Sequence, residues 1–250
     1  MNVAVLFDLE DTLVKTPWSV RQHVLEFRRE TRRKLIDLGI PKTVLEGIKR
    51  ATIMRNIASE YVQRHFSEER AGKYRREMEI FLNHYELDSA KKSRLFPETI
   101  STLKTLRELG AKIGLVTNTS RQAVDVVFKI HGLKEYFDVV VTRKDVTKLK
   151  PDPEGVLLAE RKLGGARRFV VVGDLVLDVL AAKRANSVAI MVTRDLEKSD
   201  SKDLLRSLPE IPRKSKRAHG EGEAFQADYN IKSLHEVPSI VRAEERKDRC

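Results

Sequence analysis

An apolar run followed by a group of carboxylates stands out in the segment Asn2-Val-Ala-Val-Leu-Phe-Asp8-Leu-Glu10-Asp11-Thr12-Leu13-Val14. Residues 3–7 form a continuous apolar run, which is typical of a strand buried on both faces of a parallel sheet. Three carboxylates follow at once, at Asp8, Glu10 and Asp11. Such a cluster after a buried strand is costly unless it binds a cation or takes part in chemistry. Because ligands of open α/β sheets bind at the carboxyl ends of strands, Asp8 is expected to lie in a site.

The composition indicates a globular protein that is large enough to bury a core. The 250 residues suit one large domain, or a core with a smaller partner. There is no run of 18 apolar residues that would predict a membrane span, and no secretory signal pattern precedes the first strand. The single cysteine, Cys250, excludes an intramolecular disulfide and a Cys-based metal site. We therefore expect a cytoplasmic enzyme, whose oligomeric state the sequence does not specify.

Residues 15–94 are predicted to form an all-helical insert. Apolar residues recur at helical spacing in three segments, 20–38, 44–65 and 74–85. The insert carries 19 Lys and Arg against 11 Asp and Glu, which is most of the excess in a chain of net charge +11. Two interpretations stay open: these charges are solvated helix faces, or they form a basic lid over an anion site. A basic chain suits anionic ligands that range from small phosphates to nucleic acid.

Beyond the insert, predicted strands and helices alternate in units of roughly 30 residues. This alternation indicates a parallel sheet with right-handed crossovers, and so a doubly wound, Rossmann-like α/β core. The expected strands are 112–116, 138–142, 169–173 and 187–192, and the expected helices lie at 97–109, 121–131, 153–163 and before 186.

The predicted domains are a core of residues 1–14 and 95–250 and a helical cap of residues 15–94. Within the core, residues 195–224 are rich in Ser, Lys, Asp, Pro and Gly and are expected to form a mobile surface loop. A late edge strand is expected at 227–231, and Ser233 is expected to cap a final helix.

Polar residues follow two of the predicted strands and the loop between them. Thr117 and Asn118 come after 112–116, where a hydroxyl and backbone N–H groups at a strand-to-helix turn can hold phosphate oxygens. The alternative role of Thr117, shared with Asn118 and Thr119, is a helix cap. Lys150 precedes a Pro-Asp-Pro segment, and a lysine there can neutralise a nucleophile and a transferring phosphoryl group. Lys148, by contrast, is expected to face solvent.

A last pair of carboxylates follows the strand at 169–173. Asp174 and Asp178 stand four residues apart in Gly173-Asp-Leu-Val-Leu-Asp. Mg²⁺ prefers one or two carboxylates together with waters and substrate phosphate, so this pair suits that ion. The alternative role of Asp178 is that of an acidic residue at a helix N-terminus.

These four segments, in this order, resemble the motifs of the haloacid dehalogenase-like (HAD) hydrolases. The first motif of the family's phosphatases reads Asp-x-Asp-Gly-Thr-Leu, and this chain has Glu10 for the second Asp and Asp11 for the Gly. The resemblance covers residues 1–14 and 95–192, and more weakly 227–241. The insert stands where subclass-one members, including phosphoglycolate phosphatase-like proteins, carry their helical cap.

The resemblance implies a Mg²⁺-dependent phosphatase that cleaves a small phosphomonoester through an aspartyl-phosphate intermediate on Asp8. In relatives the second Asp of the first motif protonates the leaving group and then activates water, and Glu10 would take that role. The implied catalytic residues are Asp8, Glu10 and Lys150. The implied phosphate-binding residues are Thr117, Asn118 and Lys150. The implied metal site comprises Asp8, Glu10 through its backbone carbonyl, Asp174 and Asp178.

Glu10 is the departure on which the functional prediction depends. Its side chain is one methylene longer than that of Asp, and a misplacement of ~1 Å can cost ~10²-fold in rate. From the sequence we expect Glu10→Asp to keep or raise turnover, whereas a large drop would indicate a site rebuilt around the longer side chain.

Two other classes of function stay open. The first is a catalytically weak HAD-fold protein whose basic cap binds an anionic partner such as RNA. The second is another chemistry on this fold: a phosphotransferase or mutase remains possible, whereas Asp174 and Asp178 argue against a carbon–halogen hydrolase, which needs no metal.

Overall fold

The computed structural model describes residues 1–17, 20–194 and 226–247, and these residues fall into two compact units. The core unit contains residues 1–16, 87–194 and 226–247, and the helical unit contains residue 17 and residues 20–86. The predicted loop at 195–224 lies outside the described residues.

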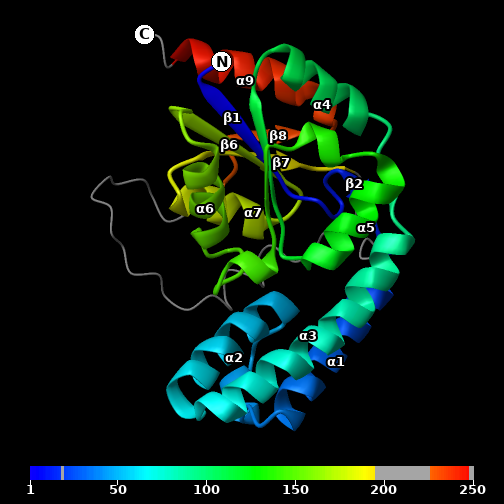
Figure 1. The fold of residues 1–250 in the computed structure, drawn as a ribbon, viewed down its shortest axis with the longest axis vertical. Helices are drawn as coiled ribbons and strands as arrows, with labels where there is room; N and C mark the ends of the chain where they lie inside the picture. The colour runs from blue at the N-terminus through cyan, green and yellow to red at the C-terminus, as the bar shows by residue number, and fades with distance from the viewer. Residues whose placement is uncertain (18–19, 195–225, 248–250) are drawn as a thin grey trace. The chain divides into compact units, whose positions relative to one another are not determined.

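A six-stranded sheet forms the centre of the core unit, in the order β5-β4-β1-β6-β7-β8 (Figure 1). Every neighbouring pair in this sheet is parallel. The prediction of a doubly wound α/β core is therefore confirmed. The strands are β1 (Val3–Phe7), β4 (Lys112–Val116), β5 (Val139–Val141), β6 (Arg168–Gly173), β7 (Val188–Val192) and β8 (Tyr229–Ile231).

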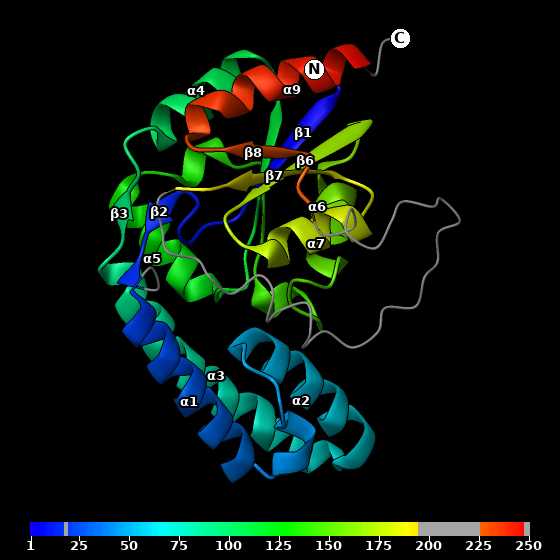
Figure 2. The ribbon, with the colours of Figure 1, turned by 180° about the vertical axis from the view of Figure 1, so that it is seen from behind.

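Successive residues of β1 bury their side chains in two different hydrophobic layers, as the two-residue period of a strand requires. Val3, Val5 and Phe7 belong to one layer, and Ala4 and Leu6 belong to the other. Helices cover both faces of the sheet, and Figure 2 shows α4 and α9 together on one side and α6 and α7 on the other. The first layer includes residues of α4 (Thr99–Glu108), α5 (Arg121–His131) and α9 (Val237–Lys247), and the second includes residues of α6 (Glu154–Leu163) and α7 (Val176–Arg184).

A short antiparallel pair, absent from the sequence prediction, lies where the chain leaves the core strands and returns to them. It joins β2 (Val14–Lys15) to β3 (Arg94–Leu95), with Val14 opposite Leu95. Two residues per strand are too few for a period-2 pattern to be recognised, which explains why the sequence did not reveal it.

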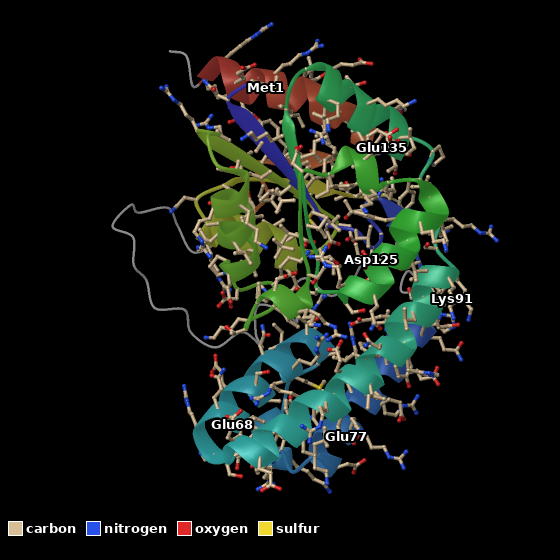
Figure 3. The ribbon with its side chains drawn as sticks, in the orientation of Figure 1. Met1, Glu68, Glu77, Lys91, Asp125 and Glu135 are labelled. Atoms are coloured by element: carbon tan, nitrogen blue, oxygen red, sulfur yellow. The ribbon has the colours of Figure 1, made fainter. Side chains whose placement is uncertain are left out.

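The insert is helical, as predicted, with α1 (Arg21–Asp37), α2 (Ala51–His65) and α3 (Glu68–Lys91). Within it the Nζ of Lys34 lies 2.8 Å from the carboxylate of Glu77, which is labelled in Figure 3. In the described part of the chain no helix is both long and apolar enough to cross a membrane.

The predicted second helix, 44–65, was wrong at its start. Residues 42–45 form a 3₁₀ turn, and Gly47 follows with a positive φ of 71°. The guanidinium of Arg32 donates to the carbonyls of Leu45 and Ile48 and holds this turn outside the helix. The α-helix therefore begins only at Ala51.

Replacing Gly114 with Ala should destabilise the core unit. Gly114 pairs with Leu6 on one side and Val139 on the other, and an added Cβ would lie 2.6 Å from a methyl of Leu6 and 2.8 Å from one of Val139. Overpacking of this kind costs ~1–3 kcal/mol. We expect Gly114→Ala to lower the free energy of unfolding by that amount, measured by urea titration followed by circular dichroism.

The matched control is Gly72→Ala in α3, where the nearest atom to an added Cβ is a guanidinium nitrogen of Arg76 at 3.5 Å. Because Ala favours a helix interior over Gly by roughly 0.5–1 kcal/mol, this variant should match or exceed the wild type. Equal stability of Gly114→Ala and the wild type would contradict the packing described for β4.

Candidate active site

Three of the predicted site residues directly follow three adjacent strands, β4, β1 and β6. Asp8 follows β1, and its N–H donates to the carbonyl of Val172 at 2.9 Å. Thr117 follows β4, and its N–H donates to the carbonyl of Val141 at 3.0 Å. Asp174 follows β6 directly. Parallel pairing therefore places these residues at the same edge of the sheet.

Asp8, Asp174 and Asp178 form a buried acidic cluster. Each offers one carboxylate oxygen, and the three oxygens lie within 4.8 Å of one another. The hydroxyl of Thr12 donates to Asp174 Oδ1 at 3.2 Å and so fixes that carboxylate. The structure thus brings together three of the four residues that the sequence assigned to a metal site. The side chain of Glu10 is not part of this cluster.

Lys150 is the cation of this cluster. Its Nζ donates to Asp8 Oδ1 at 2.6 Å, to Asp178 Oδ1 at 2.6 Å and to the carbonyl of Val116 at 2.9 Å. Lys148 is exposed, and its backbone N–H donates to Glu154 Oε2 at 2.8 Å. The expectation that Lys148 faces solvent is confirmed, and Lys150 is the lysine that contacts the acidic cluster.

Burial and charge act in opposite directions on the protonation of this cluster. Burial raises the pKa of Asp8 to about 7, even though the Lys150 ammonium beside it acts to lower that pKa. Burial also disfavours the charged form of Lys150, but the carboxylates of Asp178 and Asp8 hold its pKa above the ordinary lysine value. Among the described residues, the ammonium of Lys150 contacts two of the three carboxylates of the cluster, those of Asp8 and Asp178.

Asp178 has two partners. Its Oδ1 accepts from Lys150, and its Oδ2 accepts from the N–H of Leu175 at 3.0 Å, so it also serves as the acidic residue at the start of α7. Gly173 makes this approach possible, because an added Cβ there would lie 2.3 Å from Asp178 Cγ.

Asn118 holds the backbone of Lys150 from both sides. Its Oδ1 accepts from the Lys150 N–H at 3.0 Å, and its Nδ2 lies 3.4 Å from the Lys150 carbonyl. The side chain that the sequence assigned to phosphate therefore positions the lysine in this structure. Its amide side chain ties the turn after β4 to the loop that follows β5.

The helix-cap alternative for residues 117–119 was wrong. The N-cap of α5 is Ser120, whose hydroxyl accepts from the N–H of Ala123 at 3.3 Å. Thr117 instead accepts from the N–H of Thr119 at 3.3 Å. Thr119 in turn donates its hydroxyl to Glu10 Oε2 at 2.7 Å.

Asp11 occupies the left-handed region, with φ of 57°. Its Oδ1 accepts from the N–H of Thr16 at 3.0 Å and from the Thr16 hydroxyl at 3.3 Å. Asp tolerates this backbone conformation better than most residues do. An aspartate therefore serves at the position where the family pattern has glycine.

Arg194, which the sequence analysis missed, holds the turn after β1. Its guanidinium donates to the carbonyls of Asp11 at 2.9 Å and Thr12 at 3.1 Å. It also forms an ion pair of 2.9 Å with Glu98 and lies 3.6 Å from the ring centroid of Phe96. A single arginine two residues beyond a strand has no sequence signature. Only its place at the site edge of the sheet could have indicated it.

The family model for haloacid dehalogenase-like hydrolases matches residues 3–186 of this chain. The chain belongs to this family.

A Clostridium perfringens protein that carries the name of the pyrophosphatase PpaX is 32% identical over 188 residues, which are 75% of this chain and 82% of the relative. A phosphoglycolate phosphatase from Yersinia pestis is 35% identical over 116 residues, 46% of this chain and 50% of the relative. The pyrophosphatase PpaX of Bacillus pumilus is 40% identical over 93 residues, 37% of this chain and 43% of the relative. The chain thus spans only half or less of the latter two.

Solved structures of haloacid dehalogenase-like proteins share the fold. A HAD phosphatase from Thermococcus onnurineus matches with a TM-score of 0.51 and 28% identity over 95% of this chain and 97% of its own. A protein from Bacteroides fragilis assigned to the haloacid dehalogenase-like hydrolases matches with a TM-score of 0.59 and 22% identity, over 94% and 99% of the two chains. The second match supports the fold alone.

Replacing Arg194 with Gln should loosen the turn after β1. The side chains of Arg194 and Glu98 are only 13% and 12% exposed, so water does not fully compensate for the loss of the ion pair between them. Hydrogen bonds to charged groups contribute about 1.5–3 kcal/mol. We expect a drop of that size in the free energy of unfolding and faster amide hydrogen exchange in residues 11–16.

Arg107→Gln is the matched control, because its pair with Asp138 is more exposed, at 34% for each side chain. Exposed pairs contribute about 0–1 kcal/mol. If both variants lost the same small amount, Arg194 would be an ordinary surface residue.

Proposed function

We propose that this protein is a Mg²⁺-dependent phosphatase that hydrolyses a small phosphorylated substrate through an aspartyl-phosphate on Asp8. The observation that carries the proposal is the convergence of Asp8, Asp174, Asp178 and Lys150 in one buried cluster. Membership of the haloacid dehalogenase-like hydrolases, and relatives named as phosphatases, support phosphate as the group transferred.

The donor set fits Mg²⁺. The cluster offers three hard carboxylate oxygens within 4.8 Å of one another. Burial raises the pKa of Asp8 to about 7, and a bound cation would offset that penalty on the ionised form. Asp8, Asp174 and the backbone carbonyl of Glu10 would hold the ion, with Asp178 beside them. When bound, Mg²⁺ would polarise the phosphoryl oxygen and screen the charge of the nucleophile.

In the first half-reaction, a carboxylate oxygen of Asp8 attacks phosphorus and the bond from phosphorus to the leaving oxygen breaks. Glu10, protonated at that stage, gives its proton to the leaving oxygen. In the second half-reaction, Glu10 removes a proton from water, whose oxygen attacks phosphorus. The bond from phosphorus to Asp8 then breaks, which releases phosphate and restores the Asp8 carboxylate.

Lys150 and the turn after β4 are proposed to manage the charge of the phosphoryl group. The Lys150 ammonium, already 2.6 Å from Asp8 Oδ1, stands where negative charge develops during transfer. Thr117 and Asn118 lie at the start of a strand-to-helix turn and would present a hydroxyl and backbone N–H groups to phosphate oxygens.

The alternative that the helical unit binds an anionic partner such as RNA stays a prediction, which is based on the excess of Lys and Arg in this unit. Basic side chains of this unit engage neighbours within it, as in the pair of Lys34 with Glu77 and that of Arg75 with Glu68. No contact among the described residues favours nucleic-acid binding over hydrolysis, so the catalytic proposal is preferred.

Phosphate release should depend on Mg²⁺ and on Asp8. The panel is phosphoglycolate, p-nitrophenyl phosphate, sugar phosphates, nucleotides and, because relatives are named pyrophosphatases, inorganic pyrophosphate. We expect turnover with Mg²⁺, none with EDTA, and a loss of roughly 10³-fold or more in Asp8→Asn, as for removal of a covalent nucleophile. Asp125→Asn, at an exposed position labelled on α5 in Figure 3, should keep wild-type turnover. Turnover that survives EDTA or Asp8→Asn would contradict the mechanism.

Mg²⁺ binding without substrate should depend on Asp174. Asp174→Asn removes a carboxylate charge from the buried cluster, and we expect its affinity for Mg²⁺ to fall by roughly 10-fold or more in isothermal titration calorimetry. The same titration of Asp125→Asn should give the wild-type affinity. An unchanged affinity in Asp174→Asn would place the ion elsewhere.

A further inference from the structure

We propose that Thr119 is a positioning residue that holds the carboxyl group of Glu10 for its two proton transfers. The proposal rests on the function proposed above. Its basis is the hydrogen bond of 2.7 Å in which the Thr119 hydroxyl donates to Glu10 Oε2. Thr119 is buried, whereas Glu10 is half-buried, so the threonine is the fixed member of the pair.

The backbone of Thr119 is held on both sides of its side chain. Its N–H donates to the hydroxyl of Thr117 at 3.3 Å, and its carbonyl accepts from the N–H of Arg143 at 3.2 Å. Its β-branched side chain has few alternative rotamers. The hydroxyl is therefore already in place and need not be ordered when Glu10 binds it.

The length of Glu10 matches the distance that its side chain has to span. Glu10 follows β1 and Thr119 follows β4, the neighbouring strand. An aspartate at position 10 would be shorter by one C–C bond, about 1.5 Å. A bond of 2.7 Å lengthened by that amount exceeds hydrogen-bonding distance. The extra methylene of Glu10 and the hydroxyl of Thr119 are thus complementary.

A threonine hydroxyl suits both protonation states of the carboxyl group. It donates to Oε2, and it can go on donating there when Oε1 carries the proton, because a protonated carboxyl group still has an acceptor oxygen. It can therefore hold the group both when Glu10 gives its proton to the leaving oxygen and when Glu10 takes a proton from water. The sequence-based expectation for Glu10→Asp is then reversed, and turnover should fall.

The test is Thr119→Val, which removes the hydroxyl and keeps the shape. With p-nitrophenyl phosphate and Mg²⁺ we expect kcat to fall by ~10- to 100-fold, the cost of a misplacement of about 1 Å, while KM changes little. Thr119→Ser restores a hydroxyl and should restore most of kcat. The matched control is Thr105→Val in α4, whose hydroxyl donates to the carbonyl of Ser101 at 3.0 Å, and it should keep wild-type kcat.

A double-mutant comparison separates positioning from a general structural role. In a Glu10→Gln background there is no carboxyl group to hold, so adding Thr119→Val should cause little further loss. An equal loss in both backgrounds would overturn the proposal, as would an unchanged kcat in Thr119→Val or a failure of Ser to restore it. If Thr119→Val does not fold, a wild-type kcat in Glu10→Asp overturns the proposal and a fall in its kcat supports it.

Failure of this inference can be told apart from failure of the proposed function. Mg²⁺-dependent turnover that Asp8→Asn abolishes, together with an unaffected Thr119→Val, would overturn only the role of Thr119. Absence of such turnover in the wild type would overturn the proposed function, and the role of Thr119 with it.

Discussion

The site depends on the ammonium of Lys150, which is buried between Asp8 and Asp178. Three carboxylates with oxygens within 4.8 Å of one another repel, and burial removes the water that would otherwise screen them. Breaking a buried pair by removing one partner leaves an uncompensated charge, which is strongly destabilising. The position of Lys150 is accordingly fixed through its backbone by Asn118 and through its Nζ by the carbonyl of Val116.

Other contacts of the site also link the carboxyl ends of different strands of the sheet. Thr12 after β1 binds Asp174 after β6, and Glu10 after β1 binds Thr119 after β4. Arg194, beyond β7, holds the turn that contains Thr12. A parallel sheet brings these ends to one edge, and hydrogen bonds between them fix the side chains before any ligand arrives. Such preorganisation is what electrostatic catalysis requires.

Much of this arrangement could be predicted from the sequence, because buried parallel strands are apolar runs and the site residues follow them directly. Residues 3–7 and 112–116 were predicted with their observed bounds. The start of α2 was not, because apolar spacing does not distinguish a 3₁₀ turn and a left-handed Gly47 from a helix. Arg194 was missed because its partners, which include two backbone carbonyls and the carboxylate of Glu98, are distant in sequence and leave no pattern in the chain.

Glu10 and Thr119 show why a departure from a family pattern is best judged with its spatial neighbours. Considered alone, a longer acid two residues after Asp8 suggests a site that has lost its geometry. The structure gives that acid a hydrogen-bonding partner in the turn after the adjacent strand, at Thr119, whose own backbone is held by Thr117 and Arg143. A longer side chain need not misplace its carboxyl group when a hydrogen-bonding partner holds that group. Since Thr119 holds the carboxyl group of Glu10, glutamate in place of the family's aspartate is compatible with a site rebuilt around the longer side chain.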